Sequence, residues 1–190
     1  MIDLSLGTAV ALLWIAWLVY WYATARDLKR VQWQESLLSG LGHRIPLIAA
    51  AIILWAPHLL PPSASRRFVG ANVISQGIGL VAVVAGLAFS IWAKRQLGSN
   101  WSAAVTVKEH HTLIRTGPYR FVRHPIYTGI LLAFAGTALV IGEWRGIISC
   151  VLVLGAFIYK SRAEERRMRE TFAEYSDYER HTAALIPFIY

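Results

Sequence analysis

The sequence predicts an all-α integral membrane protein with about five transmembrane helices. Of its 190 residues, 56% are hydrophobic, and the mean hydropathy is +0.45, values that are high for a soluble domain. These residues gather in runs close to the roughly twenty that a helix needs to cross the hydrocarbon core of a bilayer. Because no water is available there to bond the backbone, each crossing segment must satisfy its own polar groups, as a helix does.

Five apolar runs account for the predicted helices. The two longest are residues 4–22 and 71–93, and the shorter ones are residues 45–60, 126–141 and 144–159. The first run is too long for the hydrophobic part of a cleavable signal peptide, and no basic residue precedes it, so we expect a mature span. Only Gly142 and Glu143 separate the last two runs, which predicts a tight antiparallel hairpin.

The net charge of +8 is distributed unevenly along the chain. Sixteen of the 19 Lys and Arg residues lie in segments 24–44, 94–125 and 160–190, on one side of the predicted topology. By the positive-inside rule this side is cytoplasmic, so the N-terminus lies outside and the C-terminus inside. The excess charge therefore indicates orientation and contact with anionic membrane lipids, and we expect no nucleic-acid partner.

The two halves of the chain differ in character, although we expect them to form one membrane domain. Residues 1–93 are predicted to be a scaffold of three helices, whereas residues 94–190 hold the hairpin between two polar segments on the cytoplasmic face. The first polar segment is expected to be mostly loop. The second continues the fifth helix, where Met168, Phe172 and Tyr175 form an apolar stripe that should fold back against that loop.

His124 and Pro125 stand at the start of the fourth run, where a helix tolerates proline in its first turn. The N–H groups of a helix start attract anions, and Arg120 and Arg123 would add guanidinium donors. The same pattern also fits a basic cluster that only meets lipid phosphates at the membrane boundary. Composition alone favours this second interpretation.

Three other patterns have plain interpretations. Residues 77–82 match the dinucleotide-binding pattern GxGxxG/A, but no strand precedes them, so close helix packing explains them better. Spacing alone makes Glu164 and Glu165 part of a solvated helix face with i, i+4 ion pairs. The adjacent His110 and His111 lack further ligands at suitable spacing, so we predict no metal.

Taken together, several of these residues resemble a known family. The segments that carry the resemblance are HHTLIRTGPYRFVRHPIYTG at residues 110–129, the glutamate pair at 164–165, and FAEYSDYERHTAALIPFI at 172–189. They are similar to the C-terminal half of the isoprenylcysteine carboxyl methyltransferase family, which is related to membrane phospholipid methyltransferases. The resemblance covers residues 94–190, and the first three runs match only in number and hydrophobicity.

The resemblance implies an S-adenosylmethionine-dependent methyltransferase without a Rossmann domain. Its cofactor would be enclosed between the two polar segments, and a lipophilic or prenylated substrate would enter from the bilayer. The expected acceptor is the carboxylate of an isoprenylcysteine-like substrate, with an isoprenoid acid, a phospholipid amine or a small thiol as alternatives. The cofactor positions that carry over are His111, Thr112, Leu113, Ile114, Tyr119, His124, Pro125, Ile126, Tyr127 and Glu164.

The resemblance also implies catalytic positions on the fifth helix. A basic residue near its cytoplasmic end would bind the substrate carboxylate; alignment from the glutamates indicates Lys160, and side-chain type indicates Arg162. A carboxylate acceptor needs no general base near neutral pH, whereas an amine or a thiol does. The candidates for such a base are Glu165, His124 and His181.

Two alternatives are also compatible with the sequence. Sterol reductases carry a similar C-terminal HP stretch, which would make the chain a membrane reductase with a nicotinamide cofactor. A non-catalytic membrane protein could instead use the basic cluster to hold lipid phosphates.

Overall fold

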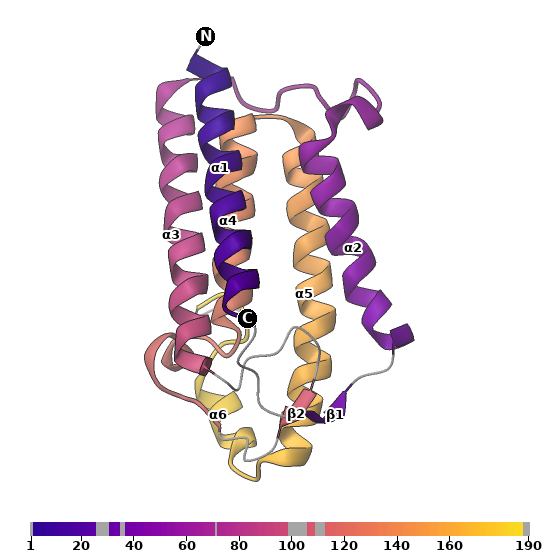
Figure 1. Cartoon of the computed structure of the whole chain (residues 1–190), viewed down its shortest axis with the longest axis vertical. Helices are drawn as coiled ribbons and strands as arrows, with labels where there is room; N and C mark the ends of the chain where they lie inside the picture. Colours follow the sequence, from indigo (N-terminus) through magenta and orange to yellow (C-terminus); the bar gives the residue numbers. More distant parts are fainter. Residues whose placement is uncertain are drawn as a thin grey trace.

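The computed structural model describes residues 2–25, 31–34, 37–70, 72–98, 106–108 and 113–187, which are nearly all helical (Figure 1). Their α-helices are α1 (Ile2–Ala23), α2 (Leu37–Trp55), α3 (Val73–Leu97), α4 (Pro125–Ile141), α5 (Trp144–Thr171) and α6 (Tyr175–His181). The other elements are the 3₁₀ helices η1 (Pro57–Leu59) and η3 (Gly117–Arg120) and the strands β1 (Val31–Gln34) and β2 (Thr106–Lys108). The predicted all-α class is confirmed.

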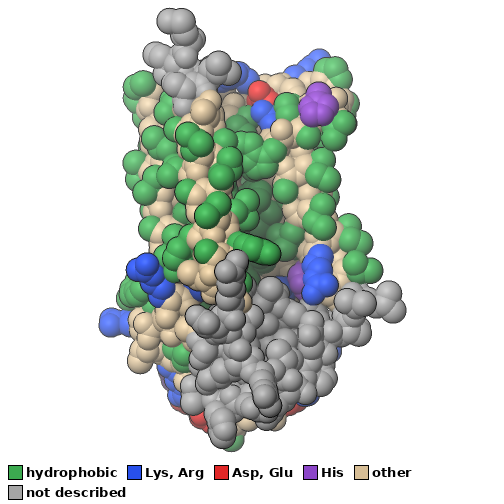
Figure 2. Space-filling model, in the orientation of Figure 1, with side chains coloured by type: hydrophobic (Ala, Val, Ile, Leu, Met, Phe, Trp, Pro, Cys, Tyr) green, Lys and Arg blue, Asp and Glu red, His purple; other side chains and the backbone are tan. Residues whose placement is uncertain are grey.

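An apolar belt surrounds the bundle. Three helices contain a window of 18 residues that is apolar enough to cross a membrane; these helices are α1 over Leu6–Ala23, α3 over Val73–Leu97 and α5 over Trp144–Thr171. The apolar parts of α2 and α4, Gly40–Trp55 and Pro125–Ile141, are shorter. Large apolar side chains are exposed on α1, α2 and α3, and Figure 2 shows hydrophobic side chains over the middle of the molecule, with Lys and Arg toward its ends. The belt fits an integral membrane protein, while the number of crossings stays a prediction.

Helices α3 and α4 lie side by side and antiparallel, and they touch through glycines. A Cβ atom added to Gly79 would lie 2.6 Å from the carbonyl oxygen of Gly136, and one added to Gly86 would lie 2.4 Å from that of Gly129. Backbones this close leave no room for a side chain, which is a common basis of helix packing in membranes. The packing interpretation of residues 77–82 is therefore confirmed at Gly79, whereas Gly77 faces open space.

Two indole hydrogen bonds attach α1 to this helix pair. Nε1 of Trp14 donates to the hydroxyl of Thr137 at 3.0 Å, and Nε1 of Trp17 donates to the hydroxyl of Ser90 at 2.8 Å. All four side chains are buried, so each polar atom finds its partner inside an otherwise apolar bundle.

Helices α4 and α5 form the predicted hairpin. Gly142 adopts a left-handed conformation (φ 70°) that ends α4, and α5 begins directly after Glu143. The connection between α2 and α3 packs on this turn, because the N–H of Phe68 donates to the Gly142 carbonyl at 2.9 Å. The guanidinium of Arg145 also donates to the carbonyl of Leu54 in the last turn of α2. These bonds fasten the end of the bundle that lies opposite α6 (Figure 1).

The segment before α4, which the sequence predicts to be mostly loop, contains the strand β2 of a small sheet. Strands β1 and β2 pair antiparallel, with Val31 opposite Lys108 and Gln34 opposite Thr106. The alternating apolar residues before Lys108 favour a strand, but its partner lies more than seventy positions away in the chain. A sequence pattern of period two indicates a strand without saying where it pairs.

Helix α5 ends at Thr171, so the predicted continuation through Tyr175 is wrong. Phe172 is extended (φ −123°, ψ 116°), and α6 begins at Tyr175, which places the proposed stripe on two helices instead of one. The fold-back of this region is confirmed, since Tyr175 and Tyr178 are buried and the Tyr178 hydroxyl donates to the carbonyl of Tyr119. Burial of two large aromatic rings favours the turn over a longer helix in water.

Candidate functional site

The start of α4 presents His124 toward α5. Proline is favourable as the first helical residue and disfavours the α conformation for the residue before it. His124 accordingly has φ −123° and ψ 60°, and its side chain does not cap its own helix. Pro118 and Tyr119 of η3 are buried, and Tyr119 packs with Ile126 in the first turn of α4. The imidazole is therefore available for contacts with a different helix.

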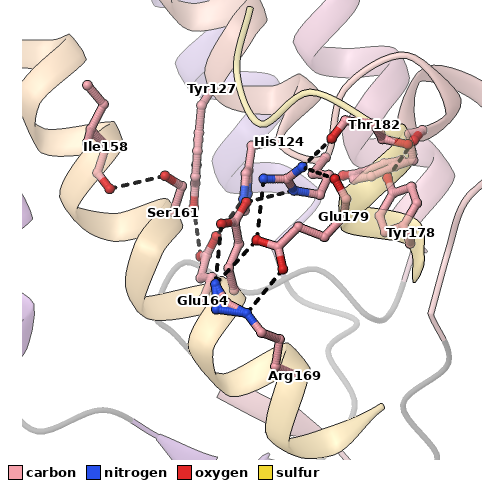
Figure 3. A network of polar contacts seen from close by, with 12 residues as sticks. His124, Tyr127, Ile158, Ser161, Glu164, Arg169, Tyr178, Glu179 and Thr182 are labelled. Carbon is pink, nitrogen blue, oxygen red and sulfur yellow. Dashed lines mark hydrogen bonds and ion pairs between the residues drawn. The ribbon is translucent and has the colours of Figure 1, made fainter. Parts of the chain in front are cut away.

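The polar extension of α5 supplies two carboxylates. The apolar run ends at Tyr159, and eight of the next twelve residues are charged, so this part of α5 lies beyond the membrane-spanning segment. Nδ1 of His124 lies 3.4 Å from Oε2 of Glu164, and Nε2 lies 3.1 Å from Oε1 of Glu165 (Figure 3). The Tyr127 hydroxyl also donates to Oε1 of Glu164 at 2.7 Å. The solvated-face interpretation of the glutamates is wrong, because Glu165 is buried and Glu164 is half-buried.

These contacts set the charges of the cluster. Burial lowers the pKa of His124, but hydrogen bonds and charges from both glutamates outweigh it and leave the pKa above the ordinary value. Burial raises the pKa of Glu165, but His124 and Arg123 outweigh it and lower the pKa to about 2. The pKa of Glu164 is likewise lowered, against burial, by His124, Lys160 and Tyr127. The two carboxylates thus favour the imidazolium form of the ring that lies between them.

Arg123 joins this cluster to α6. Its Nε lies 2.8 Å from Oε1 of Glu165, and its Nη1 donates to the carbonyl of Glu179, at 3.1 Å, and to that of Thr182. The sequence pattern predicts Arg123 as a guanidinium donor to an anion, but not as a cofactor-binding or catalytic residue. Its immediate proximity to His124 is the signal that could have found it, whereas the roles of Glu179 and Thr182 depend on the return of the chain.

The C-terminal tail, defined here as residues 182–187, lies along the start of α4. The N–H of Arg123 donates to the carbonyl of Ala183 at 2.8 Å, and the N–H of His124 donates to that of Ala184 at 3.0 Å. The hydroxyl of Thr128 donates to the carbonyl of Leu185, whose side chain is fully buried in the main apolar core. The tail therefore covers one side of the ion cluster.

An aromatic stack joins the cluster to the apolar interior. The ring of Tyr127 lies parallel to His124 at a centroid distance of 5.4 Å and stacks on Phe157 at 4.5 Å. Nζ of Lys160 lies 5.4 Å from the Tyr127 ring centroid and 4.0 Å from Oε1 of Glu164. Lys160 is buried within the cluster, whereas Arg162, the other predicted cation, is exposed. The geometry thus favours Lys160.

The remaining predicted positions are divided between the site and the surface. Ile114 packs with Ile126 and Tyr119 against the end of α3, Leu113 is half-buried, and Pro125 is fully buried beside them. His111 and Thr112 lie outside the described residues. His181 is exposed on α6, and its Nδ1 contacts the carbonyl of Asp177 at 2.9 Å.

The two arginines of the predicted basic cluster, Arg120 and Arg123, lie in different environments. The guanidinium of Arg120 lies 4.7 Å from the ring centroid of its neighbour Phe121 on the exposed surface, while Arg123 is directed into the ion cluster. Among the described residues, no group of three or more His, Cys, Asp or Glu side chains could hold a metal ion.

Comparisons with known proteins identify a family of membrane enzymes to which this chain is similar. The family model described as phospholipid methyltransferase matches residues 74–175. The protein-S-isoprenylcysteine O-methyltransferase of Saccharomyces cerevisiae is 32% identical over 116 residues, which cover 59% of this chain and 48% of that protein. The steroid 5-alpha-reductase DET2 of Solanum lycopersicum is 28% identical over 114 residues, which cover 60% of this chain and 42% of that protein. The chain thus spans about half the length of these curated relatives.

A solved structure supports the fold. The structure of the eukaryotic intramembrane Ras methyltransferase ICMT, an isoprenylcysteine carboxyl methyltransferase, superimposes with a TM-score of 0.55 at 22% sequence identity. The match covers 76% of this chain and 52% of that one. The helical fold of this chain is therefore similar to that of a solved membrane protein.

Proposed function

This chain belongs to the phospholipid methyltransferase family, and on that premise we propose that it is an S-adenosylmethionine-dependent membrane methyltransferase. Its acceptor is the carboxylate of a lipophilic, isoprenylcysteine-like substrate that enters from the bilayer. The observation that carries the proposal is the buried ion cluster in which His124, at the start of α4, contacts Glu164 and Glu165 of α5. This cluster lies within the residues that the family model matches.

The donor set of the cluster fits this cofactor. The amino-acid end of S-adenosylmethionine carries both an ammonium and a carboxylate. Glu164 is an ionised acceptor for the first, and the positive start of α4 beside His124 suits the second. Backbone groups of Leu113 and Ile114 would form hydrogen bonds with the adenine, as would those of the predicted cofactor residues His111 and Thr112. When bound, the cofactor supplies a methyl group already activated by its sulfonium.

The charges of the site favour an acceptor that is already ionised. The raised pKa of His124 favours its protonated form, which cannot accept a further proton, and Glu165, with a pKa of about 2, is too weak a base to deprotonate an amine or a thiol. An ordinary carboxyl has a pKa near 4 and needs no base at neutral pH. Lys160, next to Glu164 and over the Tyr127 ring, would hold the acceptor carboxylate.

The surrounding residues orient the acceptor and exclude water. Tyr127 and Phe157 form an apolar wall between the ion cluster and the interior of the bundle. The tail, anchored by the buried Leu185, closes the site on the side of α6. Correct orientation of two reactants can supply about 7 to 11 kcal/mol of the barrier reduction, and removal of water strengthens a carboxylate nucleophile.

Binding of S-adenosylhomocysteine to the detergent-purified protein is the first test. We expect saturable binding of about one ligand per chain by calorimetric titration, and its loss in His124→Ala and in Glu164→Ala, because both residues belong to the proposed cofactor site. Methyl transfer to an N-acetylated, S-prenylated cysteine should be lost in the same variants. Folded variants that keep wild-type binding and activity would refute the site, and a folded wild-type protein that does not bind would refute the function.

A second candidate is a membrane reductase that uses a nicotinamide cofactor. The similarity to the steroid 5-alpha-reductase of Solanum lycopersicum favours it, although over a smaller share of that protein. The same calorimetric titration with NADPH separates the two functions. Binding of NADPH without binding of S-adenosylhomocysteine would replace the methyltransferase proposal.

A further inference from the structure

We infer that Arg123 is a positioning residue for the proposed methyl transfer: it holds the Glu165 carboxylate against His124 and fastens α6 and the tail over the start of α4. The inference rests on the proposed function. Arg123 is absent from the cofactor and catalytic positions that the family resemblance implied, and its role follows from contacts that the chain makes only once it is folded.

The guanidinium of Arg123 makes contacts in two directions (Figure 3 shows the network). Toward α5, Nε lies 2.8 Å from Oε1 of Glu165, the same oxygen that lies 3.1 Å from Nε2 of His124. Toward α6, one Nη donates to the carbonyls of Glu179 and Thr182, and the other lies 3.8 Å from the Glu179 carboxylate. A side chain that is only 9% exposed thus joins α5, α6 and the tail.

The backbone at the same position repeats this connection. The N–H groups of Arg123 and His124 donate to the carbonyls of Ala183 and Ala184 in the tail. A planar guanidinium has donors enough to bind a carboxylate and two carbonyls at once, whereas the ammonium of lysine is a compact point charge. Substitution by lysine therefore keeps the charge at this position but removes the simultaneous contacts with α5 and α6.

Removal of the charge would act on His124 through Glu165. The groups that face Glu165 are Arg123 and His124 from the segment before α4, Arg169 on α5 with Nη2 at 4.0 Å from Oε2, and Tyr175 and Tyr178 on α6. Without Arg123 the buried carboxylate loses its nearest fixed cation and takes up a proton at higher pH. A protonated Glu165 no longer accepts a charged hydrogen bond from the imidazolium, so His124 is held less firmly.

Three variants separate charge, geometry and the background effect of losing an arginine. Arg123→Ala removes both the positive charge and the planar set of guanidinium donors, whereas Arg123→Lys keeps the charge. Arg120→Ala is the matched control, because Arg120 is exposed and lies three residues earlier. Two quantities are measured for each variant. The first is the dissociation constant of S-adenosylhomocysteine between pH 4 and pH 8, and the second is hydrogen exchange of peptides that contain the amides of Arg123 and His124.

We expect Arg123→Ala to weaken binding at pH 7 by about 10- to 100-fold, as for loss of a hydrogen bond to a charged group. Loss of a close opposite charge raises a carboxyl pKa by roughly one to three units, so within the measured range the affinity of Arg123→Ala should begin to fall as the pH approaches 4, whereas that of the wild type should not, since its Glu165 has a pKa of about 2. Exchange of the two amides should increase. Arg123→Lys should restore the pH profile but not the protection of the amides. Arg120→Ala should match the wild type in both measurements.

The outcomes distinguish this inference from the proposed function. If the wild type binds S-adenosylhomocysteine and Arg123→Ala has the same affinity, pH profile and exchange as Arg120→Ala, the positioning role is overturned while the function stands. If Arg123→Ala changes only the exchange, Arg123 is a structural anchor and the positioning role is overturned as well. If the folded wild type does not bind, the function fails, whereas increased exchange in Arg123→Ala would still support the fastening of the tail.

Discussion

At the scale of single residues, the charge states of the site follow from three neighbouring side chains. The pKa of His124 is raised although the ring is buried, because Glu164 and Glu165 contact both of its ring nitrogens. From the sequence, the two glutamates could be assigned only by resemblance, since their spacing equally fits a solvated helix face. The two glutamates differ in their other partners, because Arg123 contacts Glu165, whereas Tyr127 and Lys160 contact Glu164.

The ion cluster should make stability depend on pH in two directions. The pKa of Glu165 is depressed from 4.5 to about 2, so its contribution to stability is present above pH 4.5 and is lost as the pH falls toward 2. The pKa of His124 is raised above 6.5, so its contribution is present below pH 6.5 and is lost as the pH rises through the folded-state value. The wild type should therefore unfold at its highest temperature between these limits.

Thermal unfolding in detergent from pH 5 to pH 10 checks this dependence. His124→Asn removes the imidazolium and should flatten the alkaline decline of the unfolding temperature, whereas His181→Asn, on the exposed surface of α6, should keep it. An unchanged alkaline decline in His124→Asn would show that the ion cluster does not stabilise the fold in this way.

At the scale of elements, boundaries depend on the partner that an element meets. The hairpin of α4 and α5 was predictable, because Gly142 and Glu143 leave room for nothing but a tight turn between two apolar runs. The end of α5 was not, since helical periodicity continues past Thr171 while burial of Tyr175 and Tyr178 against the segment before α4 requires the chain to turn. Local patterns describe a helix face but not the surface against which it packs.

The contact between α3 and α4 predicts a difference between two glycines of α3. Gly86→Ala would place a Cβ atom 2.4 Å from the carbonyl oxygen of Gly129, so the helices must move apart. We expect destabilisation by about 1 to 3 kcal/mol, as for other overpacked interiors. Gly77→Ala meets open space and should be neutral or stabilising by up to about 1 kcal/mol, because alanine is the better helix former.

Thermal unfolding of both glycine variants in the same detergent provides the comparison. Each substitution adds one methyl group to the same helix, so a general effect of alanine appears in both variants and cancels. Equal unfolding temperatures for Gly86→Ala and Gly77→Ala would contradict the close backbone contact.

At the scale of the whole molecule, the bundle has one end closed by the hairpin and an opposite end that carries the ion cluster, α6 and the small sheet (Figure 1). On the face drawn in Figure 2, hydrophobic side chains gather between these two ends. We propose that the two ends lie on opposite sides of the membrane, with the ion cluster on the cytoplasmic side, because most Lys and Arg residues fall in the segments at that end.

Thiol labelling with a membrane-impermeant reagent tests this topology. In a Cys150→Ala background, Ser63→Cys reports on the end with the hairpin and Asp177→Cys on the end with the ion cluster, since both side chains are exposed. In intact cells we expect label on Ser63→Cys alone, and label on Asp177→Cys only after permeabilisation. Label on both from outside would refute a crossing hairpin, and the reverse pattern would refute the orientation alone.

The sequence by itself determined the membrane class, the helical fold and the family. Apolar run length, the two-residue turn at Gly142 and the motif around His124 are local properties, which a linear chain displays without being folded. Only the tertiary structure decided which side chains share the site. The pairing of Arg123 with Glu165, of the tail with α4, and of β1 with β2 joins positions 42 to 77 residues apart. Such contacts arise from the burial of whole elements, and no local pattern encodes them.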